Sequence, residues 1–319
     1  MQQRLLGQTG LSVPALMLGG NVFGWTLNEN DSFRILDSAF DAGLTFIDTA
    51  DVYSTWVPGN TGGESEAIIG KWFARAGKRN QVTIATKAGM DMGGGKTGLA
   101  AKYLEQAVED SLRRLQTDHI DLYQAHQDDA GVPLEETLGA FDVMIQKGKV
   151  RFIGASNYSG ARLREAMETS RRTGLARYQT LQPHYNMMER EPYETELAPV
   201  AAEYGLGVIP YFSLASGFLT GKYRSEADLA GKPRGGGVGK YLNDHGFAVL
   251  AALDAVANDY QSTPARVALA WLMTRPGIVA PISSATSPDH VQDLVEATKL
   301  HLSVATLALL TAASAAAAV

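Results

Sequence analysis

Apolar strand-like runs alternate with helical patterns along almost the whole chain, and this alternation constrains the fold more than any other feature. Strands are expected at residues 15–18, 44–47, 82–86, 120–124, 150–155, 178–181, 206–210 and 278–282. Helical spacing of apolar residues lies between them, near 32–42, 64–76, 100–115, 134–147, 159–173, 194–204 and 264–274. Strand–helix units repeated in this way favour an α/β fold, the closed (β/α)8 TIM barrel, over an open doubly wound sheet.

Several pieces lie outside this repeat. They are an N-terminal β-hairpin at 2–13, a loop rich in Gly, Lys and Arg at 221–240, and extra helices near 246–260 and 303–319. The first helix of the repeat is expected to begin at about Ser32, with Asp31 or Ser32 as its cap and Gly43 at its end. No linker divides the chain, so residues 1–319 are expected to form a single domain.

Composition excludes several classes of protein. The net charge is −6 and no Lys/Arg-rich block is present, which argues against nucleic acid as a partner. The absence of cysteine excludes a disulfide, a thiolate nucleophile and a Cys-ligated metal, and the six histidines form no metal-binding motif, so no metal is expected. The sequence start resembles no signal peptide, and no segment is long and apolar enough for a membrane span. We expect a cytoplasmic monomer or homo-oligomer without a membrane partner.

Polar or aromatic side chains follow most of the expected strands. The carboxyl ends of barrel strands carry the active site, so these side chains are expected to converge. In chain order they are Asp48, Tyr53, Lys87, His126, Ser156, Asn157, Gln182 and Tyr211. Each one alone has a simpler explanation, such as a solvated lysine or a structural histidine. Together, on successive strand ends, they indicate a catalytic site.

Here the chain resembles the aldo-keto reductase family over nearly its whole length. The resemblance depends on an ordered set of motifs: Phe46-Ile47-Asp48-Thr49-Ala50 with Tyr53, Gly63-Glu64-Ser65-Glu66, Ala85-Thr86-Lys87, Asp121-Leu122-Tyr123-Gln124-Ala125-His126, Gly154-Ala155-Ser156-Asn157, Gln182, Tyr211-Phe212-Ser213-Leu214 and Gly221-Lys222-Tyr223. It implies a TIM-barrel oxidoreductase that interconverts an aldehyde or ketone with its alcohol. The implied cofactor is NADP(H), with NAD(H) as the alternative.

The resemblance implies a catalytic tetrad of Asp48, Tyr53, Lys87 and His126. Tyr53 would donate a proton to the carbonyl oxygen while the nicotinamide supplies hydride. The pKa of a tyrosine is about 10, too high for easy proton exchange near neutrality, and Lys87 would lower it. Asp48 would pair with Lys87 and hold it in place, and His126 would donate a hydrogen bond to the substrate oxygen.

The remaining expected contacts follow from the same resemblance and from the residue types. Ser156, Asn157 and Gln182 would bind the nicotinamide carboxamide, and Tyr211 would stack on the ring. The other cofactor-binding candidates are Ser213 and Leu214 beside that tyrosine, Lys222 and Arg234 for the pyrophosphate, and Ser284, Thr286, His290 and Asp293 for the ribose 2′-phosphate. Trp25 and Trp56 would line the substrate pocket.

This chain departs from the family pattern near the 2′-phosphate. The Arg or Lys that the family often carries in this stretch is missing, and Leu294 stands where an Asn is common. The choice between NADP and NAD therefore stays open at this point.

Two other functions are compatible with parts of the sequence. One is a nicotinamide-sensing regulatory subunit with little turnover, since some relatives of the family serve ion channels in that way. The other is a barrel aldolase with Lys87 as a Schiff-base nucleophile.

The Gly93-Gly94-Gly95-Lys96-Thr97 segment is no P-loop, because Met90 stands where the motif requires glycine. No G-x-G-x-x-G follows the first strand, so a Rossmann domain is not supported.

Overall fold

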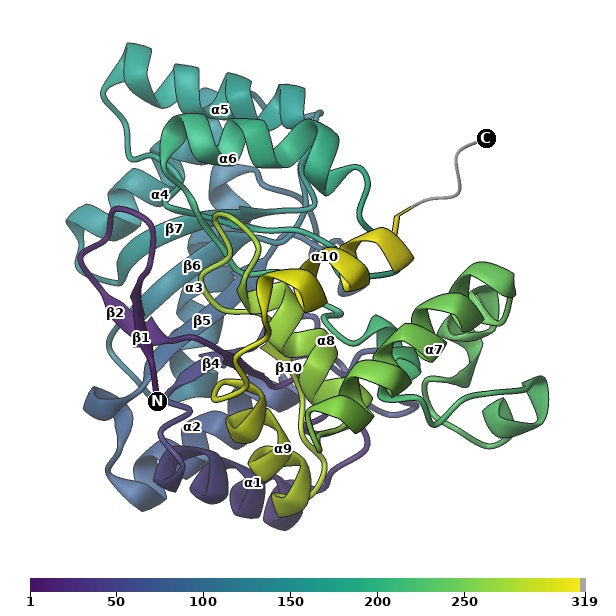
Figure 1. Ribbon diagram of the computed structural model, residues 1–319. Coiled ribbons are helices and arrows are strands. Elements are labelled where there is room, and N and C mark those ends of the chain that lie inside the picture. Colours follow the sequence, from purple (N-terminus) through teal and green to yellow (C-terminus); the bar gives the residue numbers. More distant parts are fainter. Residues whose placement is uncertain (316–319) are drawn as a thin grey trace.

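The computed structural model describes residues 1–315 and contains a curled eight-stranded parallel sheet surrounded by helices (Figure 1). The strands of this sheet are β3 (Met17–Gly19), β4 (Phe46–Asp48), β5 (Thr83–Ala88), β6 (Ile120–Ala125), β7 (Val150–Ser156), β8 (Thr180–Gln182), β9 (Gly207–Val208) and β10 (Ile282–Ser283). Their order is β10-β3-β4-β5-β6-β7-β8-β9. Val279 N donates to Val208 O (2.8 Å) and Ile282 N to Pro210 O (2.8 Å), so backbone hydrogen bonds also join the two ends of the sheet.

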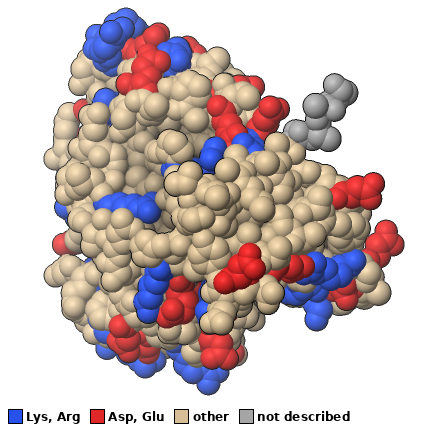
Figure 2. Space-filling view, in the orientation of Figure 1, with Lys and Arg blue, Asp and Glu red and all other residues tan. Residues whose placement is uncertain are grey.

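The helices alternate with these strands, as the sequence predicts. They are α1 (Glu29–Asp41), α2 (Glu64–Ala76), α3 (Ala101–Leu115), α4 (Leu134–Gln146), α5 (Gly160–Thr173), α6 (Ala198–Tyr204), α7 (Asp244–Asp259), α8 (Pro264–Met273), α9 (Pro288–Ala297) and α10 (Val304–Ala313). Within residues 1–315, none of them has the length and apolar character that crossing a membrane requires. Figure 2 shows acidic and basic side chains interspersed on one face of the molecule.

Strand residues alternate between two buried layers, which explains their nearly continuous apolar runs. Phe46, Ala85 and Leu122 lie in one cluster, which we call the inner cluster. Their neighbours Ile47 and Ile84 lie in the larger cluster between the sheet and the helices. A side chain two residues beyond an inner residue therefore also faces the interior.

The predicted N-terminal hairpin is confirmed. Strands β1 (Gln3–Leu5) and β2 (Ser12–Pro14) pair antiparallel, and Leu6 and Val13 are fully buried in the inner cluster. Gly7 has a φ of +55° and approaches the backbone so closely that a Cβ there would lie 2.4 Å from Gln179 O. The hairpin thus covers the amino ends of the strands (Figure 1).

Several predicted boundaries are wrong by a few residues. Helix α1 begins at Glu29, because Asn28, and neither Asp31 nor Ser32, caps it by accepting a hydrogen bond from Asp31 N (2.9 Å). Lys87 lies within β5 and not after it. The last strand is shorter than predicted, since most of 278–282 pairs only through an isolated bridge at Ile278. The predicted C-terminal helix is α10, and residues 316–319 lie outside the described residues.

Candidate active site

A cavity of about 960 Å³ lies at the carboxyl ends of the strands, where the sequence predicts the site. It is lined by every predicted site residue except Lys87 and Trp25: Asp48, Tyr53, His126, Ser156, Asn157, Gln182, Tyr211, Ser213, Leu214, Lys222, Arg234, Ser284, Thr286, His290, Asp293 and Trp56. Strand periodicity explains much of this convergence. Asp48 and Lys87 each stand two residues beyond an inner-layer residue, so both side chains face the interior.

Lys87 joins three groups directly behind the cavity wall. Its Nζ donates to Asp48 Oδ2 (2.8 Å), to the carbonyl of Thr49 (2.7 Å) and to Tyr53 Oη (2.8 Å). Tyr53 Oη donates in turn to Asp48 Oδ2 (3.0 Å), and Gln182 Nε2 donates to Asp48 Oδ1 (2.9 Å). The Lys87 side chain is completely buried. Its three N–H groups are all engaged, which disfavours the alternative of a Schiff-base nucleophile.

Burial controls the charges of this cluster. Burial lowers the pKa of Lys87, and the Asp48 carboxylate opposes that shift. Burial, followed by the charge of Asp48, raises the pKa of Tyr53 well above its ordinary value. The net shift of the Tyr53 pKa in this state is therefore upward, and the lowering expected from Lys87 alone stays a prediction. Tyr53 instead stays a protonated phenol, with its hydrogen held by Asp48.

His126 lies beside Tyr53, with ring centroids 6.0 Å apart and the rings edge to face. Burial, followed by the positive charge of Lys87, lowers the pKa of His126 well below its ordinary value. The imidazole is therefore neutral and carries a single N–H. Its Nδ1 is buried and has no hydrogen-bond partner among residues 1–315.

The residues predicted to bind the nicotinamide carboxamide contact one another in this structure. Ser156 Oγ donates to the carbonyl of Gln182 (2.9 Å), and Asn157 Nδ2 donates to the carbonyl of His126 (2.8 Å). Tyr211 Oη donates to Asn157 Oδ1 (2.7 Å). Asn157 has a φ of +54°, a left-handed conformation that Asn tolerates better than most residues. These bonds hold the polar groups at the cavity wall.

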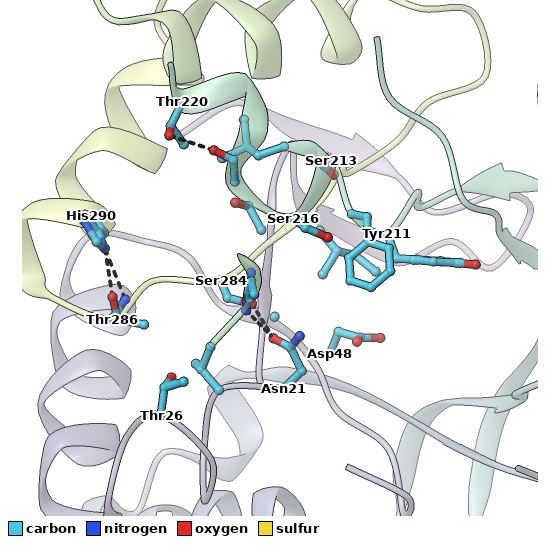
Figure 3. Close-up of a pocket in the computed structure, with 18 of the residues that line it drawn as sticks. Asn21, Thr26, Asp48, Tyr211, Ser213, Ser216, Thr220, Ser284, Thr286 and His290 are labelled. Carbon is cyan, nitrogen blue, oxygen red and sulfur yellow. Dashed lines mark hydrogen bonds between the residues drawn. The ribbon is translucent and has the colours of Figure 1, made fainter. Parts of the chain in front are cut away.

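The groups expected near the ribose phosphate extend from the middle of the cavity, at Ser284, to Thr286 and His290 (Figure 3). Ser284 Oγ donates to Asn21 Oδ1 (2.6 Å), and the Thr286 hydroxyl lies 3.1 Å from His290 Nδ1. In Figure 3, Thr286 and His290 lie on the opposite side of the view from Asp48. In the described part of the chain, no group of three acidic or histidine side chains is placed to hold a metal ion.

Basic side chains reach the cavity from the segment 221–241. Lys222, Lys232 and Arg234 line it. The pKa of Lys222 is lowered, first by burial and then by the positive charges of Arg234 and Lys232. The guanidinium of Arg234 also lies 5.5 Å from the ring of Trp25. Trp25 packs behind Trp56 edge to face (5.6 Å) and does not line the cavity, whereas Trp56 is 48 % exposed within it.

Sequence reasoning missed several residues that line or support the cavity. Met90 follows Lys87 by three residues and Phe212 follows Tyr211 by one. Considering more residues after each predicted strand would therefore have identified both. His184, which stacks on Tyr211 with ring centroids 5.2 Å apart, follows Gln182 in the same way. Arg266 has no such signal, because it comes from α8 and not from a strand end.

Comparisons with known proteins agree with this geometry. The model of the Aldo/keto reductase family matches residues 15–315. The "Uncharacterized oxidoreductase YrpG" of Bacillus subtilis is 36% identical over 95% of this chain and 92% of its own. The "Aldo-keto reductase YhdN" of the same organism is 35% identical over 93% and 89%. The "Probable voltage-gated potassium channel subunit beta" of Arabidopsis thaliana is 32% identical over 93% and 91%. The chain belongs to the aldo/keto reductase family.

Proposed function

We propose that this protein is an NADP(H)-dependent oxidoreductase that interconverts an aldehyde or ketone with its alcohol, with NAD(H) as a second cofactor. The observation that carries the proposal is the position of Tyr53 Oη, 2.8 Å from Lys87 Nζ and 3.0 Å from Asp48 Oδ2, at the wall of a cavity. A phenol that is positioned by a cation and a carboxylate and faces a cavity can act as the general acid toward a carbonyl oxygen.

The cavity suits a nicotinamide dinucleotide. Its volume of about 960 Å³ lies at the upper end of the roughly 300–1,000 Å³ typical of cofactor sites. Ser156, Asn157 and Gln182 would hold the carboxamide, and Lys222 and Arg234 would hold the phosphates. The bound cofactor supplies the hydride or accepts it.

The side chains would then act on the substrate oxygen as follows. Tyr53, which is protonated because burial and Asp48 raise its pKa, donates its proton to the oxygen as negative charge develops there. The phenolate left behind is stabilised by the Lys87 ammonium at 2.8 Å. The neutral imidazole of His126 donates a hydrogen bond to the same oxygen. In the reverse direction, the phenolate accepts the proton of the alcohol.

Aromatic and apolar side chains surround the acid on the open side. Trp56 and Phe212 are 48 % and 45 % exposed, and Met90 lines the same cavity. Burying a hydrophobic substrate against these groups is favourable, whereas a charged group there would lose its hydration. We therefore propose an uncharged carbonyl substrate with an apolar or ring-containing body.

The architecture that we propose for this activity is one closed (β/α)8 barrel. The hydrogen bonds of Val279 N and Ile282 N to the β9 end support closure, and the hairpin, sheet and helices share buried clusters. We accordingly propose that residues 1–319 form a single domain, acting in the cytoplasm as a monomer or homo-oligomer.

Replacing Tyr53 by Phe tests the proposed acid. We expect turnover with NADPH and an aromatic aldehyde to fall by about 10²- to 10⁴-fold, because the proton donor is lost. The dissociation constant for NADPH should change little, since the ring remains. Tyr204→Phe on α6 is the matched control and should keep full turnover. A Tyr53→Phe variant with most of its activity would refute the assignment.

A second candidate function is a cofactor-binding regulatory subunit. The observation that favours it is the 32% identity to a protein named as a probable potassium channel subunit beta. Such a subunit would bind NADPH and show a single turnover at most. Continuous consumption of NADPH with a panel of carbonyls separates the two functions, because only an enzyme sustains many turnovers.

A further inference from the structure

A second ion pair lies in the wall of the cavity, between two helices. Arg266 of α8 donates from Nε (2.9 Å) and from Nη2 (2.6 Å) to Asp293 Oδ1 of α9. Both residues line the cavity, and their side chains are 27% and 38% exposed. Asp293 stands one helical turn after His290, which Figure 3 shows on the opposite side from Asp48. A ligand in the cavity can therefore reach this pair.

Arg266 supplies the cation that the neighbouring segment lacks. The stretch 276–298, which contains the hydroxyls of Ser284 and Thr286, holds neither Lys nor Arg. The other basic residues of the cavity, Lys222, Lys232 and Arg234, come from a different segment. A guanidinium binds a phosphate with two parallel hydrogen bonds, which a hydroxyl or a helix terminus alone does not provide.

Asp293 has the opposite preference. In dinucleotide sites a carboxylate accepts a hydrogen bond from the ribose 2′-hydroxyl of NAD, whereas an arginine accommodates the 2′-phosphate of NADP. This chain places both kinds of group in one pair. Both donor atoms of Arg266 converge on Oδ1, and Oδ2 of Asp293 and Nη1 of Arg266 have no hydrogen-bond partner among residues 1–315. Each member of the pair thus keeps an atom for a ligand.

We propose that Arg266 and Asp293 together read the 2′ position of the adenosine ribose. Arg266 binds the 2′-phosphate of NADP(H), and Asp293 accepts a hydrogen bond from the 2′-hydroxyl of NAD(H). This inference rests on the proposed nicotinamide-dependent function and assigns its cofactor preference to a residue of α8. Because the two groups favour different cofactors, the unaltered protein binds both, and the balance between them is set by this pair.

Binding measurements on variants of both residues test this assignment without any need for turnover. Dissociation constants are measured by calorimetry for NADPH, NADH, 2′,5′-ADP and 5′-AMP. Arg266→Ala should weaken NADPH and 2′,5′-ADP by about 10- to 100-fold, since a charged hydrogen bond is lost. The constants for NADH and 5′-AMP should change by less than about threefold. Arg266→Lys should retain part of the NADPH affinity.

Asp293→Asn should act in the opposite direction. It removes a negative charge beside the phosphate and the acceptor for the hydroxyl, so the ratio of NADPH to NADH affinity should rise by about tenfold. Opposite shifts from the two variants cannot arise from a general loss of folding. Arg164→Ala is the matched control, because Arg164 pairs with Glu203 between α5 and α6 and lines no part of the cavity.

The outcomes separate this proposal from the one on which it rests. If Arg266→Ala weakens NADPH and NADH equally, or neither, the assignment to the 2′ position is wrong while the proposed function stands. If the unaltered protein binds neither dinucleotide, both proposals are overturned.

Discussion

At the scale of single residues, Asp51 is a buried titratable group that the proposed reaction does not use. Asp51 is 1 % exposed, and its Oδ1 has no hydrogen-bond partner among the described residues. Burial, followed by the charge of Glu66, raises the pKa of Asp51 to about 8, against the opposing charges of Arg114 and Lys87. Glu66 itself accepts hydrogen bonds from Thr86 and Arg114. Asp51 is therefore a carboxyl that the fold keeps protonated near neutral pH.

This raised pKa predicts how stability depends on pH. The unfolded chain releases the Asp51 proton at a pKa of about 3.9. The folded protein holds the proton until about pH 8, so the contribution of Asp51 to stability is full below pH 4 and is lost as the pH rises through 8. We expect Asp51→Asn to be more stabilising at pH 9 than at pH 5, by roughly 2–4 kcal/mol. Urea unfolding at both pH values measures this difference.

The control for this prediction is Glu105→Gln, which alters an exposed carboxyl on α3. Its effect on the free energy of unfolding should be within about 0.5 kcal/mol at either pH. An Asp51→Asn effect that is equal at pH 5 and pH 9 would contradict the predicted pKa.

At the scale of elements, two glycines in helices have opposite surroundings. A Cβ on Gly70 of α2 would lie 2.1 Å from Arg114 O and 2.7 Å from the Leu115 carbonyl carbon, both at the end of α3. A Cβ on Gly139 of α4 would meet nothing within 4 Å. Gly70→Ala should therefore destabilise the protein by about 1–3 kcal/mol or more, because α2 and α3 must move apart.

Gly139→Ala provides the matched comparison for that variant. It should stabilise the protein by about 0.5–1 kcal/mol, since alanine has the higher helix propensity and no clash opposes it. Thermal unfolding of both variants measures whether each substitution raises or lowers the stability. If Gly70→Ala proved as stable as Gly139→Ala, the close approach of α2 to α3 described here would be incorrect.

The strands and helices also show which features of the fold can be predicted from the sequence and which cannot. The alternation of strands and helices could be predicted, because buried parallel strands are apolar on both faces. The last residue of each strand could not be predicted, because the apolar run stops before the backbone pairing does. Asp48, Lys87 and Gln182 still pair through their backbones while their polar side chains face the interior. Arg266 was missed for another reason, namely that helix residues reach the cavity only through tertiary packing.

At the scale of the whole molecule, one end of the sheet forms the cavity and the other end contributes to stability. The carboxyl ends of the strands carry the cavity, and the hairpin covers the amino ends through Leu6 and Val13. Arg4 fastens this hairpin to the chain before β10, with Nη1 donating to the carbonyls of Met273 and Ile278 (3.0 Å each). Damage to the hairpin should therefore reduce stability without altering cofactor affinity.

Neighbouring leucines of the hairpin allow this separation to be tested. Leu6 is completely buried, whereas Leu5 is 66 % exposed. Leu6→Ala should lower the free energy of unfolding by about 2–5 kcal/mol, because it leaves a void in the inner cluster. Leu5→Ala should change it by no more than about 0.5 kcal/mol. At a temperature where both variants are folded, their dissociation constants for NADPH should equal that of the unaltered protein. A weaker constant for Leu6→Ala alone would mean that packing at the amino ends is coupled to the cavity through the inner cluster.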